Sequence, residues 1–364
     1  MLSRAQASGQ AVSPGALRIA ELRQSSAGEV SRPRSSPLVP LAPSEPNAPD
    51  AVPAARPSSP KVAILLCTYQ GQHYLEEQLM SFQAQKHANW VLHVSDDGSS
   101  DDTRHILRRY KALLGAEKMS VKEGPLQGFA FNFLSLTADS RAQADYYAYS
   151  DQDDVWEADK LERAVAWLQT VSPSVPALYC SRTRIVDAQD VSIGLSPLFE
   201  KPPSFANAIV QNIGGGNTMV FNEAARQLIA QTTAANQVVS HDWWAYMLVS
   251  ACGGAVRYDP YPGVRYRQHA NNLVGANNSW RARLFRIRML AQGRFKRWND
   301  QNVAALQSLE HLMTPENQQT LRLFAQARQD TVVRRLFALW RSGVRRQTWA
   351  SHASLFVAAL FGKI

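Results

Sequence analysis

Carboxylates gather in one short run of this sequence, Ser150-Asp151-Gln152-Asp153-Asp154. Asp151 and Asp153 are two residues apart, so in an extended segment their side chains point to the same side, about 6.6 Å apart along the strand. Two carboxylates at that spacing suit a hard divalent cation, Mg²⁺ or Mn²⁺, that is shared with substrate phosphates. We expect Asp154 to point away from the cation or to cap the helix that follows.

Two more polar runs accompany the first, Cys67-Thr68-Tyr69-Gln70-Gly71 and Ser95-Asp96-Asp97-Gly98-Ser99. One acidic turn alone is typical of a solvated loop with a helix cap. Two acidic turns, each directly after an apolar run, are harder to assign to solvent, because like charges brought together repel unless a cation or donor groups balance them.

Several function classes lack their signatures. No Gly-x-x-x-x-Gly-Lys-Ser/Thr loop is present, and no Gly-x-Gly-x-x-Gly follows the first apolar run, which argues against P-loop ATPases and dinucleotide oxidoreductases. The three cysteines, Cys67, Cys180 and Cys252, are far apart, so we expect free thiols in a reducing compartment rather than a disulfide framework or a zinc site.

The elements that must position these loops alternate along the chain. Apolar runs predict strands at 62–66, 90–95, 146–149 and 178–180, and helical spacing predicts helices at 72–85, 101–114 and 157–169. This order is typical of an α/β fold, a mostly parallel sheet with helices on both faces. Ligands bind at the carboxyl ends of such strands, so the three polar loops are expected to share one rim.

The chain divides into three parts by composition. Residues 1–60 are rich in Pro, Ser and Ala without any period, which predicts a disordered extension. Residues 61–278 form the predicted catalytic domain and carry 18 Lys and Arg against 22 Asp and Glu. Residues 279–364 are predicted to be helical and carry 15 against 4, so the net charge of +9 belongs to this basic C-terminal region.

The basic region has three interpretations. It is a helical subdomain with a solvated face, or a surface that contacts the anionic inner leaflet of a membrane. The third interpretation, RNA binding, is the least favoured, because the region lacks aromatic stacking motifs. No apolar run approaches the ~20 residues of a membrane span, and the N-terminus lacks a signal-peptide pattern. The expected location is therefore cytoplasmic, at most peripheral at the membrane.

The stretch from Lys61 to about Asn278 resembles the family 2 glycosyltransferases, and it is most similar to bacterial rhamnosyltransferase-like members of surface polysaccharide assembly. Any one motif is weak, but seven in order over 218 residues are specific. The matching motifs are Leu66-Cys67-Thr68-Tyr69-Gln70-Gly71, Ser95-Asp96-Asp97-Gly98-Ser99, Gly128 to Asn132-Phe133, Ser150-Asp151-Gln152-Asp153-Asp154-Val155-Trp156, Gly214-Gly215-Gly216-Asn217-Thr218, His241-Asp242-Trp243-Trp244 and Tyr266-Arg267-Gln268-His269.

The resemblance implies a GT-A fold with a nucleotide-binding half and an acceptor half. In the donor half, Thr68 and Tyr69 would line the nucleoside pocket, and Asp97 or its neighbour Asp96 would contact the base or ribose. Asp151 would belong to the same donor site through the diphosphate.

The resemblance also implies the reaction. Asp151 and Asp153 would form the metal-diphosphate motif, with Asp153 the direct ligand, and His269 would complete the metal site. Asp242 would be the general base that takes the proton of the acceptor hydroxyl. A single displacement of a nucleoside diphosphate inverts the sugar, and a divalent cation stabilises the leaving charge. The implied acceptor is a saccharide or a lipid-linked saccharide.

Each assignment has a structural alternative. Trp243 and Trp244 suit the core of a helix whose first turn holds Asp242, although a Trp beside the base also suits stacking on a sugar face. His269 alone suits a surface or core histidine. The run Gly214-Gly215-Gly216-Asn217 suits an ordinary loop, whereas the resemblance implies a glycine-rich contact with the acceptor or the sugar.

At the level of function, the alternatives are a nucleotidyltransferase and an inactive nucleotide-sugar-binding module. A nucleotidyltransferase would want a Gly-rich basic loop after the first strand, which is missing here. Processive synthases of the family carry Gln-x-x-Arg-Trp and membrane spans. In this chain four residues separate Gln292 from Arg297-Trp298, which favours transfer of one or a few sugars.

Overall fold

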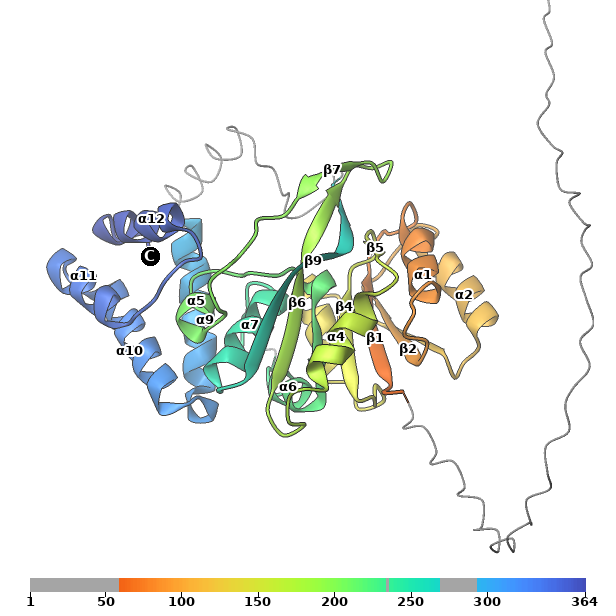
Figure 1. Cartoon of the computed structure of the whole chain (residues 1–364), viewed down its shortest axis with the longest axis horizontal. Coiled ribbons are helices and arrows are strands. Elements are labelled where there is room, and N and C mark those ends of the chain that lie inside the picture. The colour runs from red at the N-terminus through yellow and green to blue at the C-terminus, as the bar shows by residue number, and fades with distance from the viewer. Residues whose placement is uncertain (1–58, 234–235, 269–292) are drawn as a thin grey trace, which may run out of the picture. The chain divides into compact units, whose positions relative to one another are not determined.

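The computed structural model describes residues 59–233, 236–268 and 293–364. The predicted disordered extension, apart from residues 59 and 60, and His269 lie outside the described residues. In the described part of the chain one nine-stranded mixed sheet forms the centre, with helices on both faces and a helical region at the C-terminus (Figure 1).

The first half of the sheet is parallel. Four strands lie in the order β3 (Met119–Glu123), β2 (Trp90–Asp96), β1 (Val62–Thr68) and β4 (Tyr146–Ser150). Every residue of β1 is buried, because helices cover both of its faces. Alternate β1 side chains face opposite ways: Val62, Ile64 and Leu66 enter one core cluster, and Ala63, Leu65 and Cys67 enter the other.

The predicted helices cover one face. They are α1 (Leu75–Gln83), α2 (Thr103–Leu114) and α4 (Lys160–Leu168). Their apolar members at helical spacing meet β1 and β2 in one core cluster, as expected. The opposite face is covered by α3 (Phe129–Thr137), α6 (Glu223–Ile229) and α7 (His241–Ala251), whose apolar residues form the other cluster.

The second half of the sheet is mixed. From β4 the order continues through β8 (Val220–Asn222), β6 (Ala177–Val186), β9 (Ala255–Arg267) and β5 (Val155–Trp156), while β7 (Ser192–Leu195) pairs with β6. Strands β5, β7 and β8 run antiparallel to their neighbours. The short elements α5 (Phe205–Ala208) and η1 (Gly216–Thr218) lie in the connection from β7 to β8.

The C-terminal region is helical, as predicted. It contains α9 (Arg294–Ser308), η2 (Glu310–Leu312), α10 (Pro315–Gln329), α11 (Val332–Arg341) and α12 (Trp349–Leu360). Buried residues of α9 and α10, including Leu306, Leu321 and Phe324, belong to the same core cluster as α7. None of the helices in the described ranges is both long and apolar enough to cross a membrane.

Candidate active site

The three polar loops lie at one edge of the sheet, as the sequence predicts. Strand β1 pairs in parallel with both β2 and β4, with Thr68 opposite Asp96 and Leu66 opposite Ser150. The loops that follow these three strands therefore begin side by side at the carboxyl ends of the parallel strands.

Gln152 joins two of these loops. Its amide oxygen accepts a hydrogen bond from the Tyr69 N–H, and its amide nitrogen donates to the Tyr69 carbonyl, both at 2.8 Å. A Cβ on Gly71 would lie 2.3 Å from the Gln152 amide oxygen, so any side chain at position 71 would force the Gln152 amide to shift. Sequence reasoning gave Gln152 no role; its place between Asp151 and Asp153 was the available signal.

Asp96 holds the donor-side loops together from inside. It is 3% exposed and accepts hydrogen bonds from Thr68, Ser99 and the guanidinium of Arg104 at 2.6 to 3.0 Å. Burial acts to raise the pKa of Asp96, but the hydrogen bonds from Ser99, Arg104 and Thr68 outweigh it and lower the pKa. The carboxylate is therefore saturated within the protein.

The other two predicted donor-side residues are more accessible. The Tyr69 side chain is 58% exposed. Asp97 is half-buried, and one of its carboxylate oxygens accepts the Leu126 N–H at 2.7 Å. A ligand at this rim would therefore meet Tyr69 and Asp97 before Asp96 and Thr68, whose hydroxyl is buried and bonded to Asp96.

The Asp151 carboxylate lies within electrostatic range of two others. Burial, and then the negative charges of Asp153 and Asp242, raise the pKa of Asp151 to about 8. Burial also raises the pKa of the Cys67 thiol, with added effects of Asp151 and Asp97. The fold thus brings Asp242 from α7 toward the acidic loop after β4, although the two are 91 positions apart.

Asp151 and Asp153 would suit a divalent cation only if its remaining ligands came from substrate or from residues outside the described ranges. Within the described ranges no cluster of three or more His, Cys, Asp or Glu side chains is arranged to hold a metal. Asp151 and Asp153 supply two carboxylates, which is the number that Mg²⁺ commonly takes from protein when phosphates and water complete its shell. The predicted third ligand, His269, follows directly after the last described residue of this segment.

Asp154 points away from this pair, as expected, but it does not cap a helix. Helix α4 begins six residues later, after Asp159. Asp154 is fully buried and accepts hydrogen bonds from the Asn217 side chain and from the Arg267 N–H. Burial, then the charges of Asp153 and Asp151, raises its pKa. It therefore ties the acidic loop to the glycine-rich motif and to the end of β9.

Arg267 is a second residue that sequence reasoning left without a role. It is 1% exposed, and its guanidinium donates to the Asp153 carbonyl at 3.1 Å, to the Ala188 carbonyl at 3.0 Å and to the Glu77 carboxylate. It also lies over the Tyr74 ring, 4.7 Å from its centroid. One buried side chain thus fixes the acidic loop against α1 and orients the end of β9.

Asp242 occupies the first turn of α7. One carboxylate oxygen accepts from the Asn212 side chain at 3.0 Å and the other from the Trp243 N–H at 2.6 Å. Trp243 and Trp244 are buried and bond to the Ala208 carbonyl and the Thr232 hydroxyl. The idea that one of them stacks on a sugar is therefore wrong, because both belong to the core.

His241 lies in an aromatic pocket just before Asp242. It is 3% exposed, stacks on Phe133 with ring centroids 3.8 Å apart, and has no hydrogen-bond partner for either ring nitrogen among the described residues. A Cβ on Gly216 would lie 2.3 Å from its Nε2 atom, so the glycine permits this approach. Burial lowers the pKa of His241 to about 4, although Asp242 acts to raise it, so the ring stays neutral.

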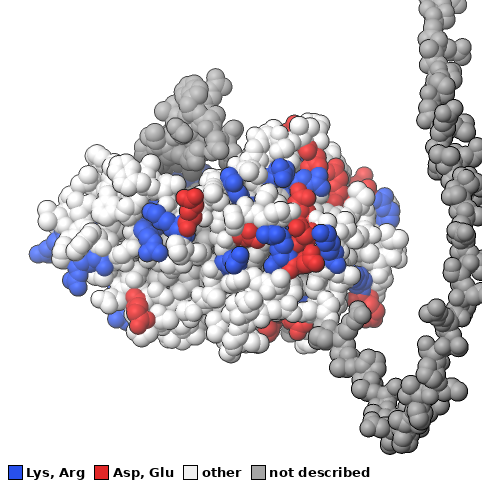
Figure 2. All heavy atoms as spheres, viewed as in Figure 1, with Lys and Arg blue, Asp and Glu red and all other residues white. Residues whose placement is uncertain are grey.

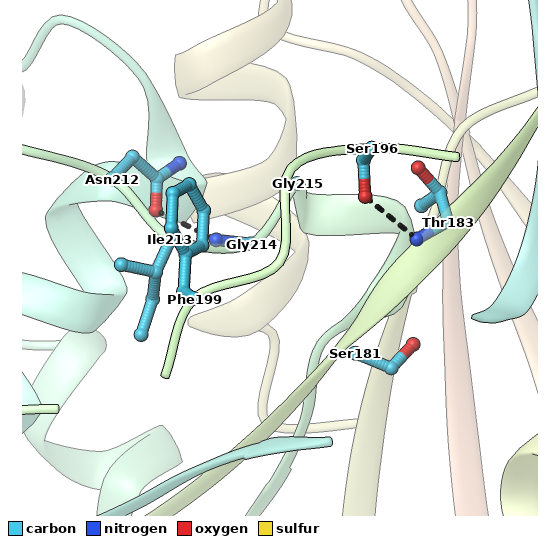
Figure 3. Close-up of a pocket in the computed structure, with 8 residues that line it drawn as sticks. All are labelled: Ser181, Thr183, Ser196, Phe199, Asn212, Ile213, Gly214 and Gly215. Atoms are coloured by element: carbon cyan, nitrogen blue, oxygen red, sulfur yellow. Dashed lines mark hydrogen bonds between the residues drawn. The ribbon is translucent and has the colours of Figure 1, made fainter. Parts of the chain in front are cut away.

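A small cavity lies beside Asn212 (Figure 3). Its volume is about 190 Å³, and no charged side chain lines it. The hydroxyl-bearing residues lie opposite Phe199 and Ile213, and the first two glycines of the motif form part of its wall. The lining residues are Ser181, Thr183, Ser196, Phe199, Asn212, Ile213, Gly214 and Gly215. Asn212 thus contacts both this cavity and Asp242.

Comparison with known proteins agrees with this arrangement. Residues 63–246, which include the three rim loops and Asp242, match the profile described as glycosyl transferase family 2. The chain belongs to this family. The predicted α/β fold class of GT-A type, with a helical C-terminal region, is thereby confirmed.

Two curated relatives indicate the setting. The chain is 30% identical over 233 residues to a dTDP-rhamnosyl transferase, RfbG, of Shigella flexneri, covering 61% of this chain and 78% of that protein. It is 31% identical over 111 residues to the Escherichia coli UDP-Glc:alpha-D-GlcNAc-diphosphoundecaprenol beta-1,3-glucosyltransferase WfgD, covering 29% of this chain and 40% of that protein. Family 2 membership identifies the chain as a glycosyltransferase.

The solved structures found by structural comparison have lower sequence identity to this chain. Residues 1–349 of S. aureus TarS in complex with UDP-GlcNAc are 14% identical, with a TM-score of 0.47 and coverage of 78% of this chain and 81% of that one. The mannosyltransferase PcManGT from Pyrobaculum calidifontis, in complex with GDP-Man and Mn²⁺, is 18% identical, with a TM-score of 0.44 and coverage of 84% and 86%.

Proposed function

We propose that this glycosyltransferase is inverting and metal-dependent, and that it moves a sugar from a nucleotide-diphosphate donor to a hydroxyl of a saccharide or lipid-linked acceptor. The observation that carries the proposal is that Asp242 lies close enough to Asp151, at the carboxyl end of a parallel strand, to raise its pKa. A base and a diphosphate-cation site must lie on opposite sides of one sugar carbon for a single displacement.

The proposed step uses few groups of the chain. Asp242 takes the proton of the acceptor hydroxyl as its oxygen forms a bond to the anomeric carbon. The bond from that carbon to the diphosphate oxygen breaks, and the nucleoside diphosphate leaves. Asp151 and Asp153, with His269, would hold a Mn²⁺ or Mg²⁺ ion, and that ion, when bound, offsets the charge on the leaving diphosphate. Asn212 keeps the Asp242 carboxylate oriented.

The donor nucleoside is proposed to bind against the loops after β1 and β2. Tyr69 and Asp97 are accessible there, and Thr68 and Asp96 hold the loops in place. Rhamnose from a dTDP donor is favoured by the name of the Shigella flexneri relative. The uncharged cavity beside Asn212 suits a neutral saccharide acceptor, since Phe199 offers an apolar wall and the opposite wall carries hydroxyls.

The proposed setting is the cytoplasmic side of a membrane, with transfer of one or a few sugars rather than processive synthesis. The diphosphoundecaprenol acceptor named for the Escherichia coli relative is lipid-linked. The basic C-terminal region would contact the anionic inner leaflet that carries such an acceptor. Cys67, Cys180 and Cys252 are all free, which agrees with a reducing compartment.

Replacement of the base tests the mechanism. We predict that Asp242→Asn lowers turnover about 10²–10⁴-fold with donor affinity nearly unchanged, because only proton removal is lost. The measurement is nucleoside diphosphate release from a panel of nucleotide sugars with Mn²⁺ or Mg²⁺, together with calorimetry of donor binding. Asp330→Asn, at the end of α10, is the matched control and should stay active. Full turnover in Asp242→Asn would remove this residue as the base.

The metal role has its own test. Asp153→Ala is expected to abolish the part of donor affinity that depends on divalent cation, because it removes a carboxylate that would hold the cation. Calorimetry with and without Mn²⁺ measures that part directly. Unchanged metal-dependent affinity in Asp153→Ala would contradict the assignment. Release of pyrophosphate from a nucleoside triphosphate and a sugar 1-phosphate would instead favour the nucleotidyltransferase alternative.

A further inference from the structure

Helix α11 turns an apolar stripe away from the protein. Val333, Phe337 and Trp340 are spaced by four and three residues, so they share one face of the helix. Their side chains are 79%, 56% and 69% exposed. Such a stripe normally faces a core, yet here Leu339 and Ala338 supply the inward contacts.

Helix α12 packs against α11 and adds exposed apolar side chains of its own. Between Gln347 and Gly362 the sequence contains no charged residue. Single exposed apolar residues are normal on a protein surface, but a group on two adjacent helices marks a contact site. The exposed members are Trp349, Val357, Leu360 and Phe361, of which Trp349 is 82% and Phe361 74% exposed.

The charges carried by the same two helices are all positive, although Asp330 precedes the first residue of α11 by two positions. Residues 331–364 contain six Lys and Arg and no Asp or Glu. Around α11, Figure 2 shows Lys and Arg but no acidic side chain. Arg334 and Arg341 are exposed, and the Arg341 guanidinium lies 5.8 Å from the Phe337 ring centroid. Arg335, in contrast, turns inward to the Ala327 and Ala359 carbonyls.

The positive charge of α11 and α12 indicates what kind of surface they could contact. A second copy of the face would bring like charges together, which is unfavourable. The long segments of the chain outside the described residues are also cationic: residues 1–58 carry six Arg against four Asp and Glu, and residues 269–292 carry four Arg and no acid. The complementary surface is therefore both anionic and apolar, as an anionic phospholipid leaflet is.

We propose that α11 and α12 form a membrane-docking surface, in which Val333, Phe337, Trp340 and the exposed α12 residues enter the headgroup boundary while Arg334 and Arg341 contact lipid phosphates. Aromatic side chains favour that depth in the bilayer. The proposal rests on the proposed function only in so far as a lipid-linked acceptor would lie in the same leaflet. It locates membrane contact on an exposed aromatic face rather than on basic charge alone.

Vesicle flotation of the full chain tests this surface. The vesicles contain phosphatidylcholine alone, or equal parts phosphatidylcholine and phosphatidylglycerol. The wild-type protein should float with the mixed vesicles and be released as salt rises. Phe337→Ser combined with Trp340→Ser should lower its partition at least about tenfold, because two exposed rings lose their burial in lipid. Arg334→Gln combined with Arg341→Gln should lower it about tenfold and weaken the salt dependence.

Matched controls lie on α2. Leu113 is 71% exposed, like Trp340, so Leu113→Ser should float like the wild type. Arg108→Gln removes an exposed charge from the same helix and should also have no effect. Donor hydrolysis without vesicles should be equal in all these variants, which separates failure of docking from failure of the proposed reaction.

Three results would overturn the proposal. The first is an absence of wild-type flotation with the anionic vesicles. The second is equal flotation of the wild type and the Phe337→Ser, Trp340→Ser variant. The third is a wild-type dimer by sedimentation that the same variant converts to a monomer, which would make this face an interface between copies.

Discussion

Gln152 and Gly71 show how single residues set the donor side of the site. The Gln152 amide pairs with both backbone polar groups of Tyr69, and it would have to move if position 71 carried a side chain. Two hydrogen bonds of ordinary strength contribute about 0.5–1.5 kcal/mol each, so their loss should be felt in ligand binding at this loop.

A double-mutant cycle tests that contact. Gly71→Ala should raise the donor dissociation constant about tenfold or more, because its Cβ displaces Gln152 and with it the Tyr69 loop. In a Gln152→Ala background the same change should cost far less, since nothing remains to collide. Calorimetry of donor binding to the four proteins gives the coupling. Additive effects would show that residues 71 and 152 do not interact.

His241 predicts a pH dependence of stability. Its pKa, about 4, lies below the ordinary value of 6.5 because the ring is buried. The stability tied to the neutral ring is therefore complete above pH 6.5 and is lost as pH falls toward 4. Relative to His241→Phe, the wild type should lose up to about 3 kcal/mol of unfolding free energy across that range. Denaturant melts at several pH values measure it, and parallel curves would refute the idea.

Sequence reasoning reached some of the site residues and missed others for one physical reason. The spacing of Asp151 and Asp153 in the sequence is enough to predict that these carboxylates belong to a site. The roles of Arg267 and Asn217 could not be predicted in this way. Arg267 contacts Asp153 and Asn217 contacts Asp154, and each pair is separated by more than 60 positions of the chain. A helix cap was a reasonable local partner for Asp154, but the long-range donors bind it instead.

Helices and strands were likewise predictable where the signal is local in the sequence. Strands β1, β2 and β4 were predicted because each is a compact apolar run that the sheet buries. Strand β3 was missed because Met119–Glu123 holds only two apolar residues, and β9 because Ala255–Arg267 is charged and half-exposed along much of its length. The direction of β5, β7 and β8 depends on pairing between distant segments, which periodicity does not encode.

Neighbouring residues of α11 test its orientation. Leu339 is fully buried and Trp340 is 69% exposed. Leu339→Ala should lower the free energy of unfolding by about 2–5 kcal/mol, since it leaves a cavity. Trp340→Ser should change it by no more than about 0.5 kcal/mol. Guanidinium melts of both variants decide the matter, and the reverse order of effects would mean that α11 is rotated.

On the scale of the molecule, the C-terminal helices share a core with the catalytic sheet. Leu306, Leu321 and Phe324 join the cluster that includes α7, the helix that carries Asp242. A chain ending at residue 278 would leave that side of α7 uncovered. We predict that it loses cooperative thermal unfolding and aggregates, while a chain lacking residues 1–58 melts like the full protein. Calorimetry compares them, and a cooperative melt of the shorter catalytic fragment would contradict the shared core.

The contact between Gly71 and Gln152 also constrains the order in which this loop can change over generations. A lineage that acquires any side chain at position 71 while Gln152 is present meets a distance of 2.3 Å to its amide oxygen. A lineage that first shortens residue 152 opens the position and can then explore other residues at 71. A substitution at position 71 is therefore expected to follow, rather than precede, one that shortens residue 152.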